Sequence, residues 1–395
     1  MRQGSNNYKS ELVVKRDSLY LVGYALVLFN TFINSTTFQL LEGNNIGFMI
    51  RLTGYLLIIS HIGFKRKVKM RYFAIGIIML VISLLSLSRS GYSVLLDYAI
   101  CCVFALNVDF SKIVKVYVVE TILLTMITVI AAMTGRIENF IYYRRATGDI
   151  RMSMGFIYPT NCAAHIFFIM VGIAFLYYEK FNWKHVLGYC LTAFAVYSTT
   201  NARGPAAMII ILSLVVYFYR FFSLKDIYII PDWLLKYSTV ICALITFLLI
   251  FFYNADNAFW KAVNAFTTNR LTYAKNIMNN NKVTLFGQFI AQRGDGNGGR
   301  SAGEAYTYID LSFQRILLMY GLLLFVFIII YSVLLYNKCV SNQNYTIPLL
   351  MLVVAFYSLT AQHYFDFSYN FLLLCYFADI SPQKIVERKK HWTLR

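Results

Sequence analysis

Long, nearly uncharged apolar runs are the feature that most constrains this chain. A run of about 20 apolar residues is long enough for a helix to cross the hydrocarbon core of a bilayer. Hydrophobic residues make up 59% of the 395 residues and charged residues only 14%, which places the chain in the polytopic membrane class. The runs are continuous rather than alternating, so we expect helices and not membrane-spanning strands.

Twelve such runs predict an all-α polytopic membrane protein with about 12 transmembrane helices, forming a single integral membrane domain over 1–395. The segment 18–36 has no small-residue cleavage site, so we expect a retained first helix rather than a signal peptide. The expected spans are 19–35, 46–64, 72–88, 91–108, 113–134, 159–178, 185–200, 204–222, 235–253, 311–336, 347–364 and the short 367–380.

Basic residues predict which ends of the spans face the cytoplasm, because cytoplasmic loops carry an excess of Lys and Arg. With the N-terminus inside, the inside segments hold 22 of the 36 Lys and Arg residues, whereas the outside segments hold 12. KRKVKMR at 65–71 and the basic cytoplasmic tail at 381–395 are the strongest anchors. We interpret both as topological anchors beside anionic lipid, not as nucleic-acid sites. An even number of spans places both termini in the cytoplasm.

Lys and Arg divide unevenly between the two sides. The inside segments hold 15 Lys and 7 Arg, whereas the outside segments hold 9 Arg and 3 Lys. Arg is favoured where a planar donor must hold a phosphate or carboxylate group. Only six acidic residues lie in the outer loops, with Asp310 and Asp366 at the adjoining span ends, so the positive charge of these loops predicts an anionic ligand on that side. The outer arginines are Arg89, Arg136, Arg144, Arg145, Arg151, Arg203, Arg270, Arg293 and Arg300.

Two outer segments are long enough to be functional loops. The first extracytoplasmic loop covers 135–159, and the large one covers 254–310. The large loop contains apolar and aromatic residues such as Phe259, Trp260 and Phe266. We therefore expect part of it to pack as short helices on the outer rim.

Four stretches resemble, in order, motifs of the Wzy-type repeat-unit polymerases of capsular polysaccharide, exopolysaccharide and O-antigen assembly. RMSMGFIYPTN at 151–161 resembles the family's Arg-x-Ser-x-Gly-Phe-x-x-Pro-Asn stretch, with Thr160 inserted, and STTNARGPAAM at 198–208 resembles its Ser-x-x-x-Arg-Gly/Thr joint between two helices. DLSFQRILLMYGLLLF at 310–325 resembles the start of the helix after the family's large loop, and YSLTAQHYFDFSYNFLLL at 357–374 resembles its final polar break. The first 130 residues match only as generic membrane helices.

The resemblance implies a GT-C-like architecture and a glycosyltransferase on the outer face of a bacterial cytoplasmic membrane. Such an enzyme polymerises repeat units carried on undecaprenyl diphosphate and releases polyprenyl diphosphate. Negative charge builds on the departing oxygen, where cations stabilise the transition state. No acidic cluster with metal-ligand spacing is evident, so we expect arginines to act there without a metal or other cofactor. The expected partners are the lipid-linked oligosaccharide and the growing polysaccharide, with a flippase and a chain-length regulator as further candidates.

Several of the outer arginines, together with Arg315, are the candidate residues for binding the diphosphate. Gly204 and Pro205 can start a helix sharply, and a helix N-terminus favours anions, so we assign Arg203 to the diphosphate. Arg151 precedes the SMGF stretch and is assigned to the donor or to the loop that holds it. Further candidates, together with the joint residue Asp310, are Arg89 in SRSG, Arg270 and Arg315. Arg315 lies one turn into an apolar helix, where a charge is costly unless it is paired or faces a wet cavity.

A general base must accept the proton of the attacking hydroxyl. His363 and Asp366, in QHYFD, are near neighbours at an expected outer helix end, and Glu304 and Asp310 are further candidates. His165 could face the same cavity or be a buried neutral histidine. Four tyrosines are candidates for stacking on sugars: Tyr142, Tyr143, Tyr306 and Tyr308.

Two alternatives stay open from the sequence. An O-antigen-ligase-like enzyme would use the same donor but transfer the glycan to another acceptor. A flippase or transporter for the lipid-linked oligosaccharide would need a polar path that continues inward. Polar residues on the inner half of the spans are sparse, with Arg51 and Asp97 as the exceptions.

Overall fold

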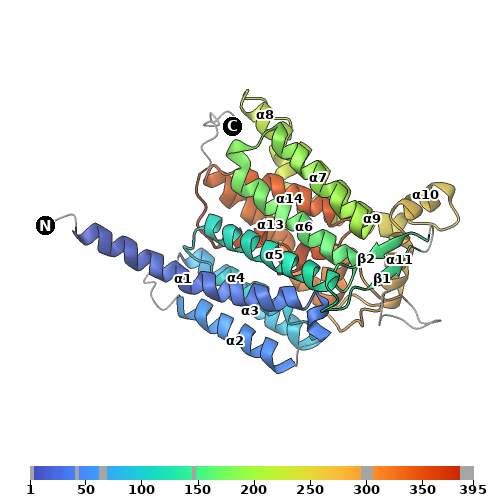
Figure 1. Ribbon diagram of the computed structural model, residues 1–395, viewed down its shortest axis with the longest axis horizontal. Helices are drawn as coiled ribbons and strands as arrows, with labels where there is room; N and C mark the ends of the chain where they lie inside the picture. Colours follow the sequence, from blue (N-terminus) through green and yellow to red (C-terminus); the bar gives the residue numbers. More distant parts are fainter. Residues whose placement is uncertain (1–3, 41–43, 62–68, 145–147, 295–305, 383–395) are drawn as a thin grey trace.

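The computed structural model describes residues 4–40, 44–61, 69–144, 148–294 and 306–382, and most of these are helical. The long helices run beside one another in one array, with α1 against α2, α3 against α4, and α7 against α8 (Figure 1). The helices are α1 (Gly4–Ile33), α2 (Asn44–Ser60), α3 (Met70–Ser90), α4 (Val94–Val103), α5 (Phe110–Met133), α6 (Pro159–Tyr177), α7 (Trp183–Thr200), α8 (Arg203–Ser223), α9 (Asp232–Phe252), α10 (Ala258–Phe266), α11 (Arg270–Asn280), α12 (Ser312–Arg315), a π-helical turn (Ile316–Tyr320), α13 (Leu322–Ser341) and α14 (Thr346–Tyr357).

Six helices of the described part are long and apolar enough to cross a membrane, which supports the predicted helical membrane class. They are α3, α5, α6 with its short extension to Lys180, α8, α9 and α13, and each overlaps an expected span. Four further expected spans contain shorter apolar helical stretches: Asp17–Ile33, Asn45–Ser60, Val94–Val103 and Thr346–Tyr357. The expected span at 185–200 lies within α7.

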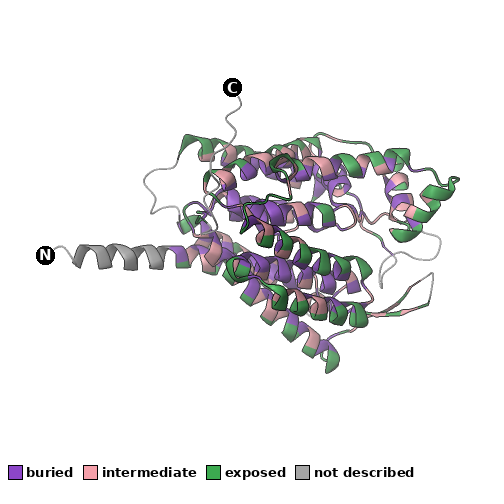
Figure 2. Cartoon of the chain, turned by 90° about the horizontal axis from the view of Figure 1, so that it is seen from above, coloured by how far each residue is buried: buried purple, intermediate pink, exposed green. Residues whose placement is uncertain are grey.

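The outward faces of the array are apolar. Figure 2 shows buried residues along the inner sides of the helices and exposed residues along the outer sides. On α5, Val119, Leu123 and Met126 are 57%, 54% and 56% exposed. A continuous apolar surface of this kind is unfavourable in water and suits contact with lipid chains.

The expected span at 311–336 is interrupted at Gly321. This glycine has φ 99°, and a Cβ there would lie 2.3 Å from the backbone nitrogen of Gly287, so only glycine fits. The approaching loop also satisfies the start of α13, because the Leu322 amide donates to the Thr284 carbonyl at 2.9 Å. The chain after the large loop therefore enters the array as a short helix, turns, and then continues as α13.

The prediction of a final membrane-spanning helix at 367–380 is wrong. This segment is irregular and buried, with a single 3-10 turn at Leu372–Tyr376. Distant side chains satisfy its carbonyls: Tyr331 donates to Leu373 at 2.6 Å, and Lys338 donates to Tyr376 at 2.8 Å. Non-helical backbone is tolerated at membrane depth when it is buried inside protein in this way.

The elements outside the long helices gather at one end of the array (Figure 1). Strands β1 (Ile141–Tyr143) and β2 (Ile150–Met152) form an antiparallel hairpin in the first predicted loop, an exception to the all-helical prediction. The second predicted loop contains α10 and α11, which confirms the expected short helices. α11 packs through Leu271, Ala274 and Ile277, whereas Phe259 and Phe266 of α10 are exposed.

Candidate functional site

The β1–β2 hairpin is docked onto the joint between α7 and α8. Arg144, directly after β1, donates through Nη2 to the carbonyl of Asn201 at 2.6 Å and to its Oδ1 at 2.9 Å. Arg151 of β2 donates through Nε to the Thr200 carbonyl at 3.3 Å. Asn201 adopts a left-handed conformation and ends α7. The hairpin therefore holds two arginines beside the helix joint.

Arg203 is the first residue of α8, with Pro205 in the same first turn, which confirms the predicted helix start. Its side chain is 57% exposed, and Nη2 lies 4.0 Å from Oδ2 of Asp149. The same Asp149 oxygen lies 3.9 Å from Nε of Arg144. One carboxylate thus serves two guanidinium groups, which leaves an excess of positive charge at the joint.

Arg151 is the most crowded of these cations. Burial, together with the charges of Arg144 and Arg270, lowers the pKa of Arg151 to about 10, so the side chain is still charged at neutral pH. Among the described residues, no carboxylate lies within salt-bridge distance of it. A half-buried cation near like charges is unfavourable, and a bound anion would relieve this repulsion.

Arg270, the first residue of α11, lies beside Asp310, which is two residues before the start of α12. Nη2 of Arg270 is 3.8 Å from Oδ1 of Asp310, and Asp310 Oδ2 accepts a hydrogen bond from Tyr306 at 2.8 Å. The Tyr306 ring stacks on Tyr273 with centroids 3.9 Å apart. Burial and the adjacent Asp310 carboxylate raise the pKa of Tyr306 well above its ordinary range, so this hydroxyl stays a donor.

Arg315 is held at the end of α12 by neutral partners. It donates to Oε1 of Gln362, whose amide nitrogen in turn donates to the Tyr308 hydroxyl. The guanidinium carbon also lies 5.7 Å from the centre of the Tyr308 ring. Asp310 forms its ion pair with Arg270 and not with Arg315. In the described part of the chain, Arg315 therefore has no carboxylate at salt-bridge distance.

His363 and Asp366 face each other across a tight turn. Nδ1 of His363 lies 4.0 Å from Oδ2 of Asp366, too far for a hydrogen bond. Oδ1 of Asp366 accepts from the Ser368 hydroxyl at 3.0 Å, which fixes the carboxylate. The His363 side chain is 5% exposed, whereas that of Asp366 is 34% exposed. Asp366 is therefore the accessible member of the pair.

A stack of three rings supports His363 from within. Tyr369 lies between His363 and His165, with centroids 3.9 Å from each. His165 is anchored on its other side, where Nε2 is 2.9 Å from the Ser35 hydroxyl. Nδ1 of each histidine is buried without a hydrogen-bond partner among the described residues. Unpaired buried nitrogens are uncommon and mark places for water, ligand or proton transfer.

The arginines near the α7–α8 joint and the residues around the His363–Asp366 turn form one electrostatic region. The charge of Arg203 acts on Arg144, those of Arg144 and Arg270 act on Arg151, and those of Arg270 and Arg315 act on His363. This region contains five arginines and three aspartates, so its net charge is positive before His363 is counted. The five arginines are Arg144, Arg151, Arg203, Arg270 and Arg315, and the three aspartates are Asp149, Asp310 and Asp366.

One predicted site residue of the described part, Arg89, does not join this region. Arg89 is exposed near the end of α3, which closes at a left-handed Gly91, and it has no ion pair or hydrogen bond with the described residues. Glu304 lies outside the described residues. The second joint, SRSG, therefore ends a helix rather than starting one, and the assignment of Arg89 to the site gains no support.

The structure adds residues that sequence reasoning did not assign to the site. Arg144 was recognisable only as one outer arginine among nine, and nothing local marked it as the residue that fixes Asn201. Gln362 and Tyr369 are ordinary polar and aromatic residues whose importance depends on partners far along the chain. In the described ranges, no group of three His, Cys, Asp or Glu side chains is arranged to hold a metal ion.

No protein-family model, curated protein or solved structure matches the chain.

Proposed function

We propose that this protein is a membrane glycosyltransferase that polymerises oligosaccharide repeat units carried on polyprenyl diphosphate, at the outer face of a bacterial cytoplasmic membrane. The observation that carries the proposal is the cation-rich region of five arginines beside the His363–Asp366 pair. A diphosphate leaving group needs such cations, and an attacking hydroxyl needs a nearby base. The order of the four motifs in the sequence supports the same assignment.

The arginines are assigned to the leaving group. The bond between the anomeric carbon of the donor and the diphosphate oxygen breaks, and both electrons stay on the diphosphate. Arg151 and Arg203 stabilise that oxygen as its charge grows, and Arg144 holds the loop that carries Arg151. Because fixed guanidinium groups in a partly buried site need little reorganisation, they favour the transition state over the ground state.

The acid–base work is assigned to the buried turn. A sugar hydroxyl of the incoming repeat unit attacks the anomeric carbon, and the new carbon–oxygen bond forms as its proton passes to Oδ2 of Asp366. Nδ1 of His363 is unpaired and lies 4.0 Å from that oxygen, and it receives the proton from Asp366 when the two side chains approach to hydrogen-bond distance in the substrate complex. Tyr369 and His165 hold the imidazole in place through their stack.

The lipid-linked glycans of a strain that lacks the protein test the proposal. We expect single lipid-linked repeat units to accumulate, and the wild-type gene to restore long polymer. Full-length polymer that is not attached to its acceptor would instead indicate a ligase, and repeat units trapped on the cytoplasmic side would indicate a flippase. Either of these outcomes contradicts the proposed polymerase.

Complementation with variants tests the residue assignments. Asp366→Asn should abolish polymer formation, because an amide cannot accept the hydroxyl proton. His363→Gln should retain a residual rate, since Asp366 stays in place, and general acid–base catalysis is worth about 10²- to 10⁴-fold in rate. A normal rate of polymer formation by Asp366→Asn would remove this turn from the mechanism.

A further inference from the structure

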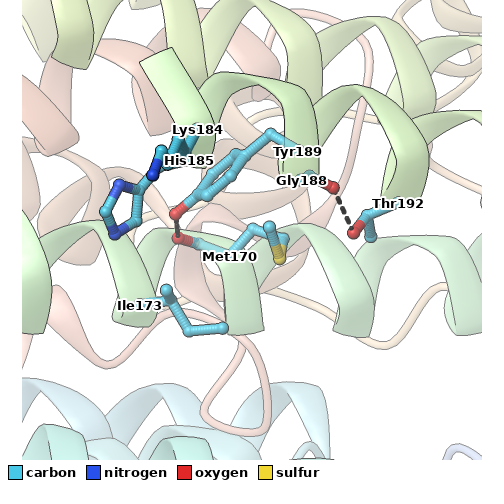
Figure 3. A pocket seen from close by; sticks show the side chains of 7 residues that line it. All are labelled: Met170, Ile173, Lys184, His185, Gly188, Tyr189 and Thr192. Atoms are coloured by element: carbon cyan, nitrogen blue, oxygen red, sulfur yellow. Dashed lines mark hydrogen bonds between the residues drawn. The ribbon is translucent and has the colours of Figure 1, made fainter. Parts of the chain in front are cut away.

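A groove lies between α6 and α7, at the end of α7 that is remote from the arginine region. It has a volume of about 410 Å³, and its walls come from these two helices (Figure 3). Arg151 contacts Thr200, the last residue of α7, whereas the groove begins at Lys184, the second residue of this helix. The lining residues are Met170, Ile173, Lys184, His185, Gly188, Tyr189 and Thr192.

The floor of the groove is fixed by contacts between α6 and α7. The Tyr189 hydroxyl donates to the Met170 carbonyl at 2.7 Å, which ties α7 to α6. The His185 ring is held by Phe181, with centroids 5.1 Å apart, and by Nδ1, which lies 3.1 Å from Oδ1 of Asn182. Gly188 leaves the groove open, because a Cβ added there would meet nothing within 4 Å.

The groove is charged at one end and apolar along its length. The exposed Lys184 lies in the first turn of α7, where the helix dipole also favours an anion. Thr192 lies eight residues further on, which is about 12 Å along the helix axis. The neighbouring lipid-facing side chains of α7 are apolar, with Leu187 and Leu191 54% and 62% exposed. A ligand in this groove would therefore meet one cation and a long apolar wall.

We propose that this groove binds an anionic phospholipid of the leaflet that meets the N-terminal end of α7. The phosphate lies at Lys184, and one acyl chain runs along Gly188 towards Thr192, over Met170 and Ile173. Basic pockets between membrane helices recognise anionic head groups in this way. Because Lys184 places a cation at one end, the groove favours an anionic lipid over a wholly apolar ligand. Because the groove opens onto the apolar face of α7, it favours such a lipid over a water-soluble anion.

Binding of phosphatidylglycerol to the purified protein in a neutral detergent, followed by native mass spectrometry, tests the proposal, with phosphatidylcholine as the comparison lipid. We expect the wild type to bind phosphatidylglycerol about fivefold more tightly, the ratio that corresponds to about 1 kcal/mol for one lysine at an anionic head group. Lys184→Ala should remove this preference. Gly188→Leu should abolish binding at the groove, because its side chain fills the path of the acyl chain.

Two control variants keep the test specific. Lys236→Ala removes a lysine from the first two turns of α9, and Ser198→Leu places the same leucine side chain at an exposed position near the other end of α7. Both should bind like the wild type. Equal affinity of the wild type for the two lipids, or wild-type affinity in either groove variant, would overturn the proposal. The measurement involves no glycosyl transfer, so its outcome is independent of the proposed enzymatic function.

Discussion

Replacing Arg151 by methionine should make the protein more stable and less active at the same time. The substitution removes the charge from β2 and keeps an unbranched apolar side chain of similar length. Arg151 is half-buried near Arg144 and Arg270, and its pKa is lowered to about 10 by this environment. The charged form is therefore disfavoured in the folded protein, and we infer that it is retained for a bound anion.

The size of the gain follows from that pKa. At about 1.4 kcal/mol per pH unit, the difference from an ordinary guanidinium corresponds to about 3 kcal/mol. The variant also loses the hydrogen bond from Nε to the Thr200 carbonyl at 3.3 Å, and such a bond is worth about 1 kcal/mol. The free energy of unfolding should therefore rise by about 2 kcal/mol. The destabilising charge is fully present below pH 10 in the wild type, so the gain should be constant between pH 6 and pH 9.

Thermal unfolding in detergent and polymer formation in cells measure the two effects. Arg151→Met should unfold a few degrees above the wild type and make little or no long polymer. Arg136→Met is the matched control, because Arg136 is an exposed arginine near the same hairpin, and it should change neither quantity. A lower unfolding temperature for Arg151→Met, combined with normal polymer, would refute the reasoning, since Arg151 would then be a structural anchor.

Three further outcomes are expected. Arg203→Ala should leave the unfolding temperature unchanged and lower polymer formation about 10-fold. This is the lower end of the effect expected for a charge-assisted contact, because the side chain is 57% exposed. A normal rate of polymer formation would mean that this arginine only anchors the helix end. Lys338→Met should lower the free energy of unfolding by about 3 kcal/mol or more, because it leaves buried carbonyls such as that of Tyr376 without a donor. Lys225→Met, at an exposed lysine, is the control and should unfold like the wild type. Reporter fusions should be active only outside the membrane at Gly294 and only inside at Lys225, and the reverse at either position would invalidate the topology deduced from Lys and Arg.

Local sequence predicted those parts of the fold that depend on neighbouring residues. The long apolar runs identified α3, α5, α6, α8, α9 and α13, because apolar length is a property of each segment. The Gly204–Pro205 pair after Arg203 predicted where α8 begins, since proline is favoured in the first helical turn. His363 and Asp366 are expected to be neighbours because only two residues separate them, and the structure brings Nδ1 of His363 to 4.0 Å from Oδ2 of Asp366.

Tertiary contacts decided what the apolar pattern could not. The segment 367–380 is as apolar as a membrane helix, yet it is not helical, because Tyr331 and Lys338 supply donors for its carbonyls. The same physics governs the site: Arg144 matters because it reaches Asn201, 57 residues away, and Tyr369 because it packs between two histidines from distant segments. The sequence alone determined which segments are apolar and where helices can start. Only the folded chain determined which buried polar groups find partners, because those partners are brought together by packing and not by proximity along the chain.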